Sequence, residues 1–402
     1  MARRDEILAH HTLVMRDGRI LDVLPSAIAA ERYAPRVLLD RPSHLLMPGL
    51  VNARTQIGSL ERAAATPQFL PEGGLLCIAN MLKSGITCFC DIGYFPQQAA
   101  LTAAAQGMRA LIGLPVAEHP SPWAHSVGEY LSRGLSLRDG YKGHPCITTG
   151  FAALRPAAMS DATFSRIGTL ADELDAGILM SLNESQADID ESLTHHGLRP
   201  LARLQRLGLL TPALTASHMT HVSAADIELA QRGGIGVTLC LESDLLRGNG
   251  LAPVVALAAA GLPLSVGSDG EVCGAAQDIW TEMKLLTLHS RSSGAVEPSL
   301  SAWDALAAAT RGGAIVLGLE AEIGTLEAGK WADLCCIDMS GPATQPLSDP
   351  VRQLVFSSGR DMVSDVWVAG RQLLSQGRFT RLDWSSLAAR LGAPTQATES
   401  GG

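Results

Sequence analysis

The chain has 402 residues, of which 47% are hydrophobic and 18% are charged, so it can bury a large core in one large domain or in one large and one small domain. Its net charge is −9, and no run of Lys or Arg is dense enough to form a track for nucleic acid or a patch for an anionic membrane. These numbers argue against a nucleic-acid partner and leave small neutral or cationic partners open.

The first residues, MARRDEILAHHTLV, lack the unbroken apolar run of a signal peptide, and nowhere do about 18 apolar residues follow one another without a breaker. We therefore expect a cytoplasmic protein that does not enter a membrane. The eight cysteines lie mostly in apolar, strand-like segments without the spacing of a zinc knuckle, which predicts buried, reduced thiols.

The elements expected in chain order begin with a β-hairpin over residues 7–23, because Asp17 and Gly18 supply the turn that a tight hairpin needs. From about Gly73, helical segments alternate with short apolar strands such as ITCFCDI, RALIGLPV and AGILMSL. Six or more such units predict a closed (β/α)₈ barrel of the TIM type, with parallel strands inside and helices outside.

Beyond the barrel the pattern returns to β-structure, with a second hairpin at AGRQ. The two ends of the chain are therefore predicted to form one discontinuous domain. The expected boundaries are a small β-sandwich from residues 1–50 and 323–385, the barrel over residues 51–322, and a C-terminal helix with a frayed tail over residues 386–402.

Several motifs appear in the order typical of one enzyme family: PGLVN at 48–52, SLNES at 181–185, ASHMTHV at 216–222, VGSDG at 266–270 and IGTLEAGKWADL at 323–334. With these motifs the chain resembles the amidohydrolase superfamily over nearly its whole length. It is most similar to the branch that contains the methylthioadenosine/S-adenosylhomocysteine deaminases and the triazine hydrolases. The resemblance implies the same barrel fold, but a fold does not fix an activity.

In that family, a His-x-His pair after the first barrel strand, a histidine after the fifth and an aspartate after the eighth hold one divalent ion, which activates a water molecule. The resemblance places these ligands at Arg54, Gln56, Ser181 and Asp269. Only the aspartate is kept, and a guanidinium has no lone pair to give and repels a cation. We therefore predict a divergent member with no metal and no other cofactor.

The family's acid–base residues are better preserved. Its proton-shuttling glutamate matches Glu184, and the histidine that contacts the attacking water matches His218. With Asp269, they are the predicted catalytic residues, at the strand ends where barrel enzymes carry out their chemistry. Two substrate-contacting histidines are replaced by Leu154 and Leu239, which makes a purine or triazine substrate unexpected.

Arg54, Gln56 and Ser181 are the predicted substrate-binding residues, since Arg54 presents a fork suited to an anionic group. The alternative is that Arg54 simply pairs with Asp269 or Glu184. Ser181 could also act as a nucleophile with His218 as its base.

The leading hypothesis is a metal-independent hydrolase, acting on a C–N or related bond of a small polar substrate in the barrel and forming a homo-oligomer. A second hypothesis is a catalytically silent barrel that serves as a structural or regulatory subunit, for which a hetero-oligomer is also open. A third is a metal-dependent deaminase or chlorohydrolase whose metal site has been rebuilt from other residues.

Overall fold

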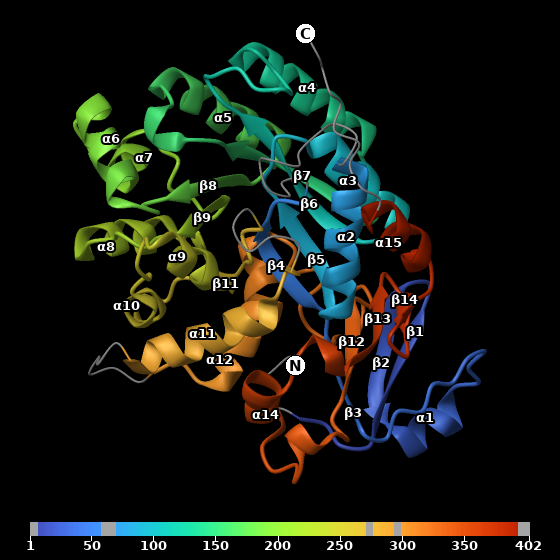
Figure 1. Cartoon of the computed structure of the whole chain (residues 1–402). Coiled ribbons are helices and arrows are strands. Elements are labelled where there is room, and N and C mark those ends of the chain that lie inside the picture. Colours follow the sequence, from blue (N-terminus) through green and yellow to red (C-terminus); the bar gives the residue numbers. More distant parts are fainter. Residues whose placement is uncertain (1–6, 58–69, 271–275, 293–298, 393–402) are drawn as a thin grey trace.

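The computed structural model describes residues 7–57, 70–270, 276–292 and 299–392, and shows a barrel of strands with a smaller β-region at its side (Figure 1). Within these ranges, no helix has the length and apolar character needed to cross a membrane.

Eight parallel strands form the central sheet in the order β11-β10-β9-β8-β7-β6-β5-β4. They are β4 (Leu50–Thr55), β5 (Ile86–Asp91), β6 (Arg109–Val116), β7 (Ile147–Ala153), β8 (Ile178–Leu182), β9 (Leu214–His218), β10 (Gly236–Leu239) and β11 (Leu264–Val266). Every residue of β4, β5 and β6 is buried, as expected of parallel strands that are covered on both faces. The predicted TIM-type barrel is thus confirmed.

The first and last strands of this sheet approach each other and nearly close the barrel. The backbone N–H of Asp269, just after β11, donates to the carbonyl oxygen of Arg54 in β4 at 3.0 Å. A Cβ on Gly267 would lie 2.6 Å from the Cβ of Arg54, so only a glycine permits this approach. The closure brings Arg54 and Asp269, which are far apart in the sequence, to the same end of the barrel.

Helices connect and surround the strands (Figure 1). They are α2 (Leu70–Lys83), α3 (Pro96–Gln106), α4 (Val127–Gly140), α5 (Asp161–Leu174), α6 (Gln186–His196), α7 (Pro200–Arg206), α8 (Ala224–Gly233), α9 (Leu241–Arg247), α10 (Val254–Ala259), α11 (Ile279–Ser292), α12 (Ala302–Ala307), a π-helical turn (Ala308–Gly312) and α13 (Gly313–Val316). Several of these helices have a serine as their N-cap residue. The hydroxyls of Ser185 and Ser223 each accept a hydrogen bond from the backbone N–H of the aspartate three residues later, and the side chain of that aspartate accepts from the backbone N–H of the serine. These caps fix where the loops above the barrel end.

The two ends of the chain meet in the smaller β-region, as predicted. Strand β3 (His44–Pro48) pairs with β12 (Leu334–Asp338), and the sheet continues through β13 (Val363–Val368), β14 (Arg371–Ser375) and β15 (Arg378–Phe379). A separate two-stranded sheet joins β1 (His11–Arg16) to β2 (Arg19–Pro25). The helices of this region are α1 (Ser26–Arg32), α14 (Pro350–Ser357) and α15 (Trp384–Gly392). The predicted domain boundaries stay a prediction.

Both predicted hairpin turns are present. Asp17 and Gly18 join β1 to β2 with φ of 52° and 81°, and Ala369 and Gly370 join β13 to β14 with φ of 46° and 71°. Two consecutive residues with positive φ give the turn whose twist matches that of the strands.

A buried ion pair fastens the small sheet to the barrel. The guanidinium of Arg109, at the start of β6, donates from Nε to Asp333 Oδ2 at 2.6 Å and from a terminal nitrogen to Oδ1 at 3.1 Å. Asp333 directly precedes β12, and its Oδ1 also accepts from the backbone N–H of Ala369 at 2.7 Å. Fork-shaped pairs of this kind fix orientation as well as distance.

The tight packing between barrel strands gives a testable expectation at Gly113 in β6. A Cβ there would lie 2.8 Å from the carbonyl oxygen of Asp91 and 2.9 Å from the Cβ of Ala152, one on each neighbouring strand. Gly113→Ala should therefore lower the free energy of unfolding by about 1–3 kcal/mol, the usual cost of overpacking, measured by urea unfolding. Gly140→Ala is the matched control, because no atom lies within 4 Å of the Cβ it adds. Equal stability of the two variants would contradict the expectation.

Candidate active site

The predicted site residues lie at one end of the barrel, where the strands finish. Arg54 is in β4, Ser181 is in β8, His218 is the last residue of β9, and Asp269 follows β11. Glu184 lies in the loop after β8. This is the end at which TIM-barrel enzymes carry their active sites.

Asp269 is bound by three donors. Arg54 Nε donates to its Oδ1 at 3.1 Å, while Ser243 Oγ and a terminal nitrogen of Arg247 donate to its Oδ2 at 2.7 and 3.3 Å. The Arg54 side chain is 8% exposed and that of Asp269 is 1% exposed. Burial alone would raise the pKa of Asp269, but the charges of Arg54, His218 and Arg247 and the bond from Ser243 hold it well below its usual range. The carboxylate is therefore ionised and committed to these partners.

Arg54 is cationic because the charge of Asp269 stabilises its protonated form. Burial alone would lower the pKa of its guanidinium, yet the charge of Asp269 raises it above the ordinary value, with a smaller contribution from Glu184. The pairing of Arg54 with Asp269, which the sequence left open as one alternative, is present in the structure.

His218 is the second centre of the site. Its Nδ1 lies 2.8 Å from Asp244 Oδ1, and its Nε2 lies 3.6 Å from Glu184 Oε2. Burial lowers the pKa of His218, but the hydrogen bond to Asp244 and the charge of Glu184 outweigh it, so the pKa is raised. The predicted partners Glu184 and His218 thus come together.

Glu184 is more accessible than His218, with its side chain 21% exposed and that of His218 fully buried. Its Oε1 lies 3.5 Å from Nδ2 of Asn249 and 3.9 Å from Nε of Arg247. Thr220 Oγ1 donates to its backbone carbonyl at 2.9 Å and so steadies the loop. A carboxylate held beside a histidine, with one face toward solvent, can exchange protons with a bound molecule.

The two other predicted substrate-binding residues, Ser181 and Gln56, also lie at this end of the barrel. Ser181 is half-buried, and across the described ranges its hydroxyl makes no hydrogen bond with Glu184, His218 or Asp269, so the geometry gives a serine triad no support. Gln56 follows β4 and lies beside Gly270, whose Cβ, if present, would be 2.9 Å from the Gln56 nitrogen. Their roles in binding stay predictions.

The sequence interpretation missed three residues that α9 brings into the site: Ser243, Asp244 and Arg247. Helix α9 is held in place by the buried carboxylate of Glu282, which accepts from the backbone N–H groups of Leu241 and Glu242 at 2.9 and 3.0 Å. The available signal was the cluster of polar residues in LESDLLR directly after the seventh barrel strand.

The paired cysteines of β5, Cys88 and Cys90, are buried and free. Burial raises the pKa of the Cys88 thiol to about 12 and that of Cys90 further still. They are thiols that pack inside the barrel and not nucleophiles.

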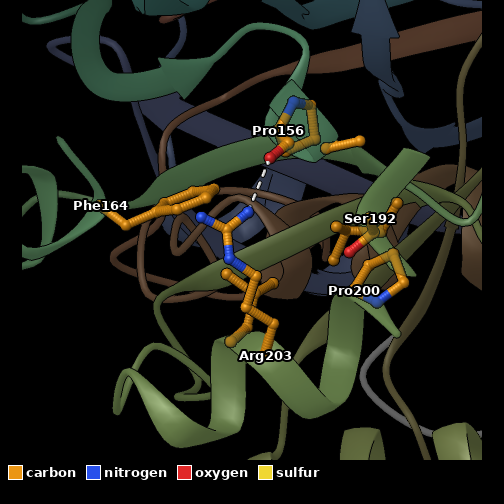
Figure 2. Close-up of a pocket in the computed structure, with 8 residues that line it drawn as sticks. Pro156, Phe164, Ser192, Pro200 and Arg203 are labelled. Carbon is orange, nitrogen blue, oxygen red and sulfur yellow. Dashed lines mark hydrogen bonds between the residues drawn. The ribbon is translucent and has the colours of Figure 1, made fainter. Parts of the chain in front are cut away.

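Two cavities lie away from this cluster. One, of about 10 Å³, holds about one water molecule and lies beside Arg203 of α7, whose guanidinium donates to the carbonyl oxygen of Pro156 and stacks on Phe164 (Figure 2). The other, of about 550 Å³, lies between α2 and the segment from Gly377 to Trp384.

Comparison with known proteins identifies the family. Residues 45–373 match the amidohydrolase family. The chain belongs to this family. The resemblance carried by the motifs is thus confirmed. Among its relatives is a 5-methylthioadenosine/S-adenosylhomocysteine deaminase from Teredinibacter turnerae, which is 36% identical over 94% of this chain and 90% of its own length. The deaminase of the same name from Saccharophagus degradans is 32% identical over 95% of this chain and 90% of its own length.

Two solved structures share the fold of this chain. An adenosine deaminase from Xanthomonas campestris with bound zinc has a TM-score of 0.93 and 36% identity, and the match covers 96% of this chain and 93% of that one. An atrazine chlorohydrolase from Arthrobacter aurescens complexed with zinc has a TM-score of 0.84 and 20% identity, with 94% of both chains covered. The second likeness supports the fold alone.

At the four positions where the resemblance places the zinc ligands, this amidohydrolase-family chain has only one side chain of a type that commonly binds zinc. Zinc is bound by lone pairs of imidazole, thiolate or carboxylate, whereas Arg54 has none and its Nε already donates to Asp269, the one carboxylate kept among the expected ligands. Across the described part of the chain, no three His, Cys, Asp or Glu side chains are grouped so that they could hold a metal ion.

Proposed function

We propose that this chain is a deaminase-like hydrolase that cleaves a C–N bond of a small polar substrate at the mouth of the barrel, without the zinc ion that similar solved structures hold. The family and the deaminase names of its relatives support a hydrolase acting on a small molecule. The observation that carries the metal-independent part is the 3.1 Å contact between Arg54 and Asp269, which puts a guanidinium against the expected ligand.

The charges of the site support this proposal. The cations are Arg54, Arg247 and His218, and the carboxylates are Asp269, Glu184 and Asp244. With His218 protonated, the two sets balance. A divalent ion added to this cluster would meet two permanent cations within contact of its one carboxylate ligand, which makes its binding unfavourable.

The residues divide the work as follows. Arg54 anchors an electron-rich group of the substrate, with Gln56 and Ser181 as further polar contacts. Glu184 takes a proton from the attacking water and returns a proton to the leaving amine, and His218 polarises the water or the substrate. The products are the hydroxyl or carbonyl compound and ammonia. Asp269 holds Arg54 and helps balance charge as the proton moves.

The test is metal content together with ammonia release. The protein is expressed with zinc, iron and manganese supplied, purified without chelator and measured by elemental mass spectrometry. We expect well below one equivalent of any metal, and ammonia release from at least one amino-substituted substrate that a chelator does not suppress. The panel should include 5-methylthioadenosine and S-adenosylhomocysteine. About one equivalent of tightly held ion would overturn the metal-independent mechanism and support a rebuilt metal site.

A matched control restores the expected ligands. The triple variant Arg54→His, Gln56→His and Ser181→His, with Asp269 kept, recreates three imidazoles and one carboxylate. This variant should take up about one equivalent of zinc while the natural chain does not.

A second candidate, the catalytically silent barrel, is favoured by one observation: Arg54 and Asp269 are almost fully buried against each other. A silent subunit predicts no ammonia release from any substrate and no copurifying ligand beside Glu184.

The oligomeric state is a prediction under both proposals. We expect a homo-oligomer for the enzyme and a homo- or hetero-oligomer for the silent subunit, measured by light scattering. A cytoplasmic location is likewise a prediction.

A further inference from the structure

Three side chains from three different elements form a continuous line through the site. Asp244 of α9 contacts Nδ1 of His218 at 2.8 Å, and Nε2 of His218 faces Glu184 at 3.6 Å. Asp244 and His218 are fully buried, and Glu184 is partly open to solvent. The line therefore runs from the interior toward the place where a substrate would bind.

The chemistry of the groups assigns the proton on His218. A carboxylate oxygen that carries no hydrogen can only accept hydrogen bonds, so the 2.8 Å contact with Asp244 Oδ1 favours a hydrogen on Nδ1. Nε2 is then the nitrogen that gains or loses a proton. Among the described residues, Nε2 has no hydrogen-bond partner although it is buried. A buried ring nitrogen without a hydrogen-bond partner destabilises the fold unless a bound molecule supplies that partner.

The backbone conformation around His218 also indicates a functional site. His218 and Met219 have φ of 73° and 57°, in the left-handed region that residues with side chains rarely adopt. The Met219 nitrogen donates to the carbonyl oxygen of Leu182 at 3.1 Å, which helps to impose this turn. Such strain persists where surrounding contacts enforce it, and it often marks a functional site. Here it aims the imidazole between Asp244 and Glu184.

We propose that Asp244 is a positioning residue, which holds His218 in the tautomer protonated on Nδ1 and so presents Nε2 to Glu184 and to the reacting group. This inference rests on the proposed function, because it concerns the same reaction. The 3.6 Å gap between Nε2 and Glu184 Oε2 is too long for a direct hydrogen bond, so a water molecule or a substrate group in contact with both completes the line. The raised pKa of His218, to which the Asp244 bond contributes, agrees with this role.

The experiment reads the tautomer directly. The full chain is labelled with ¹⁵N-histidine, the resonances of His218 are assigned by their loss in His218→Asn, and the ring nitrogens are observed by NMR near neutral pH. In the natural chain, Nδ1 should appear protonated at all pH values studied, and only Nε2 should titrate. In Asp244→Asn, the amide can rotate and donate to Nδ1, so the proton should move to Nε2. A natural chain whose Nδ1 is unprotonated would overturn the proposal without any need for a variant.

A matched control separates positioning from general destabilisation. Asp226 of α8 is also buried and is paired with an arginine, Arg199, but it does not contact His218. Asp226→Asn should therefore leave the ¹⁵N resonances of the His218 ring unchanged, even if this variant unfolds at a lower urea concentration. An Asp244→Asn spectrum identical to that of the natural chain would also overturn the proposal.

The kinetic readout depends on a substrate and the spectroscopic one does not. With a substrate in hand, Asp244→Asn should lower kcat by about 10²–10⁴-fold with little change in KM, which is the size of an acid–base contribution. If the tautomer depends on Asp244 but no substrate is turned over, the positioning role holds and the hydrolase proposal fails. If turnover is found but the tautomer is indifferent to Asp244, the hydrolase proposal holds and the positioning role fails.

Discussion

Replacing Arg109 by methionine is expected to lower the free energy of unfolding by about 3–5 kcal/mol, because it leaves a buried carboxylate without its countercharge. The Arg109 and Asp333 side chains are only 5% and 2% exposed, and two hydrogen bonds join them. Methionine keeps much of the volume of the arginine stem, so the loss comes from the charge and not from a cavity. Urea unfolding followed by circular dichroism measures the effect.

The control for Arg109→Met is Arg232→Met. Arg232 pairs with Glu228 on the surface of α8 at 3.3 Å, with the two side chains 63% and 70% exposed. Exposed pairs of this kind contribute about 0–1 kcal/mol, so this variant should unfold almost as the natural chain does. If the two variants lost similar stability, the small sheet would not depend on the Arg109–Asp333 pair.

Glu184→Gln is expected to lower turnover by about 10²–10⁴-fold on any substrate found by ammonia release, because the isosteric amide cannot carry a proton between water and the leaving amine. The contacts of Glu184 with Asn249 and Thr220 involve an amide and a backbone carbonyl, so most of the local structure should survive the change. The measurement is kcat at saturating substrate, with KM determined in parallel.

The matched control for this variant is Glu191→Gln. Glu191 lies on α6 and pairs with Arg155 at 3.6 Å, apart from the Glu184–His218 contact. This variant should keep the natural rate. Equal rates for Glu184→Gln and the natural chain would remove Glu184 from the mechanism, and a complete lack of turnover in both would favour the silent barrel.

Much of the fold could be predicted because its signals are local. Asp-Gly at 17–18 and Ala-Gly at 369–370 specify tight hairpins, and short apolar strands alternating with helices specify a parallel barrel. The pairing of the two chain ends followed from their shared β-character. These patterns depend on neighbours in the sequence, which is why they could be recognised.

The site could be predicted only in part, since side-chain contacts are not local. Glu184, His218 and Asp269 could be located from motifs, but whether Arg54 turned toward Asp269 depended on how β11 approaches β4. The contact of Asp244 with His218 could not be predicted from the sequence, because it depends on where α9 packs against the barrel. That placement depends on Glu282, which is 40 positions from Glu242 and has no local pattern to announce it.

The pairing of β3 with β12 joins two strands that the ribosome makes far apart in time. Pro48 and Cys335, which are in contact, are 287 positions apart. At a ribosomal rate of about 5–20 residues per second, β3 waits about 15–60 s for its partner to be made. Throughout that interval a strand edge of the nascent chain is unpaired while the barrel is assembled, and such edges recruit other strands. The edge of β3 that pairs with β12 therefore stays available to other strands until β12 has left the ribosome.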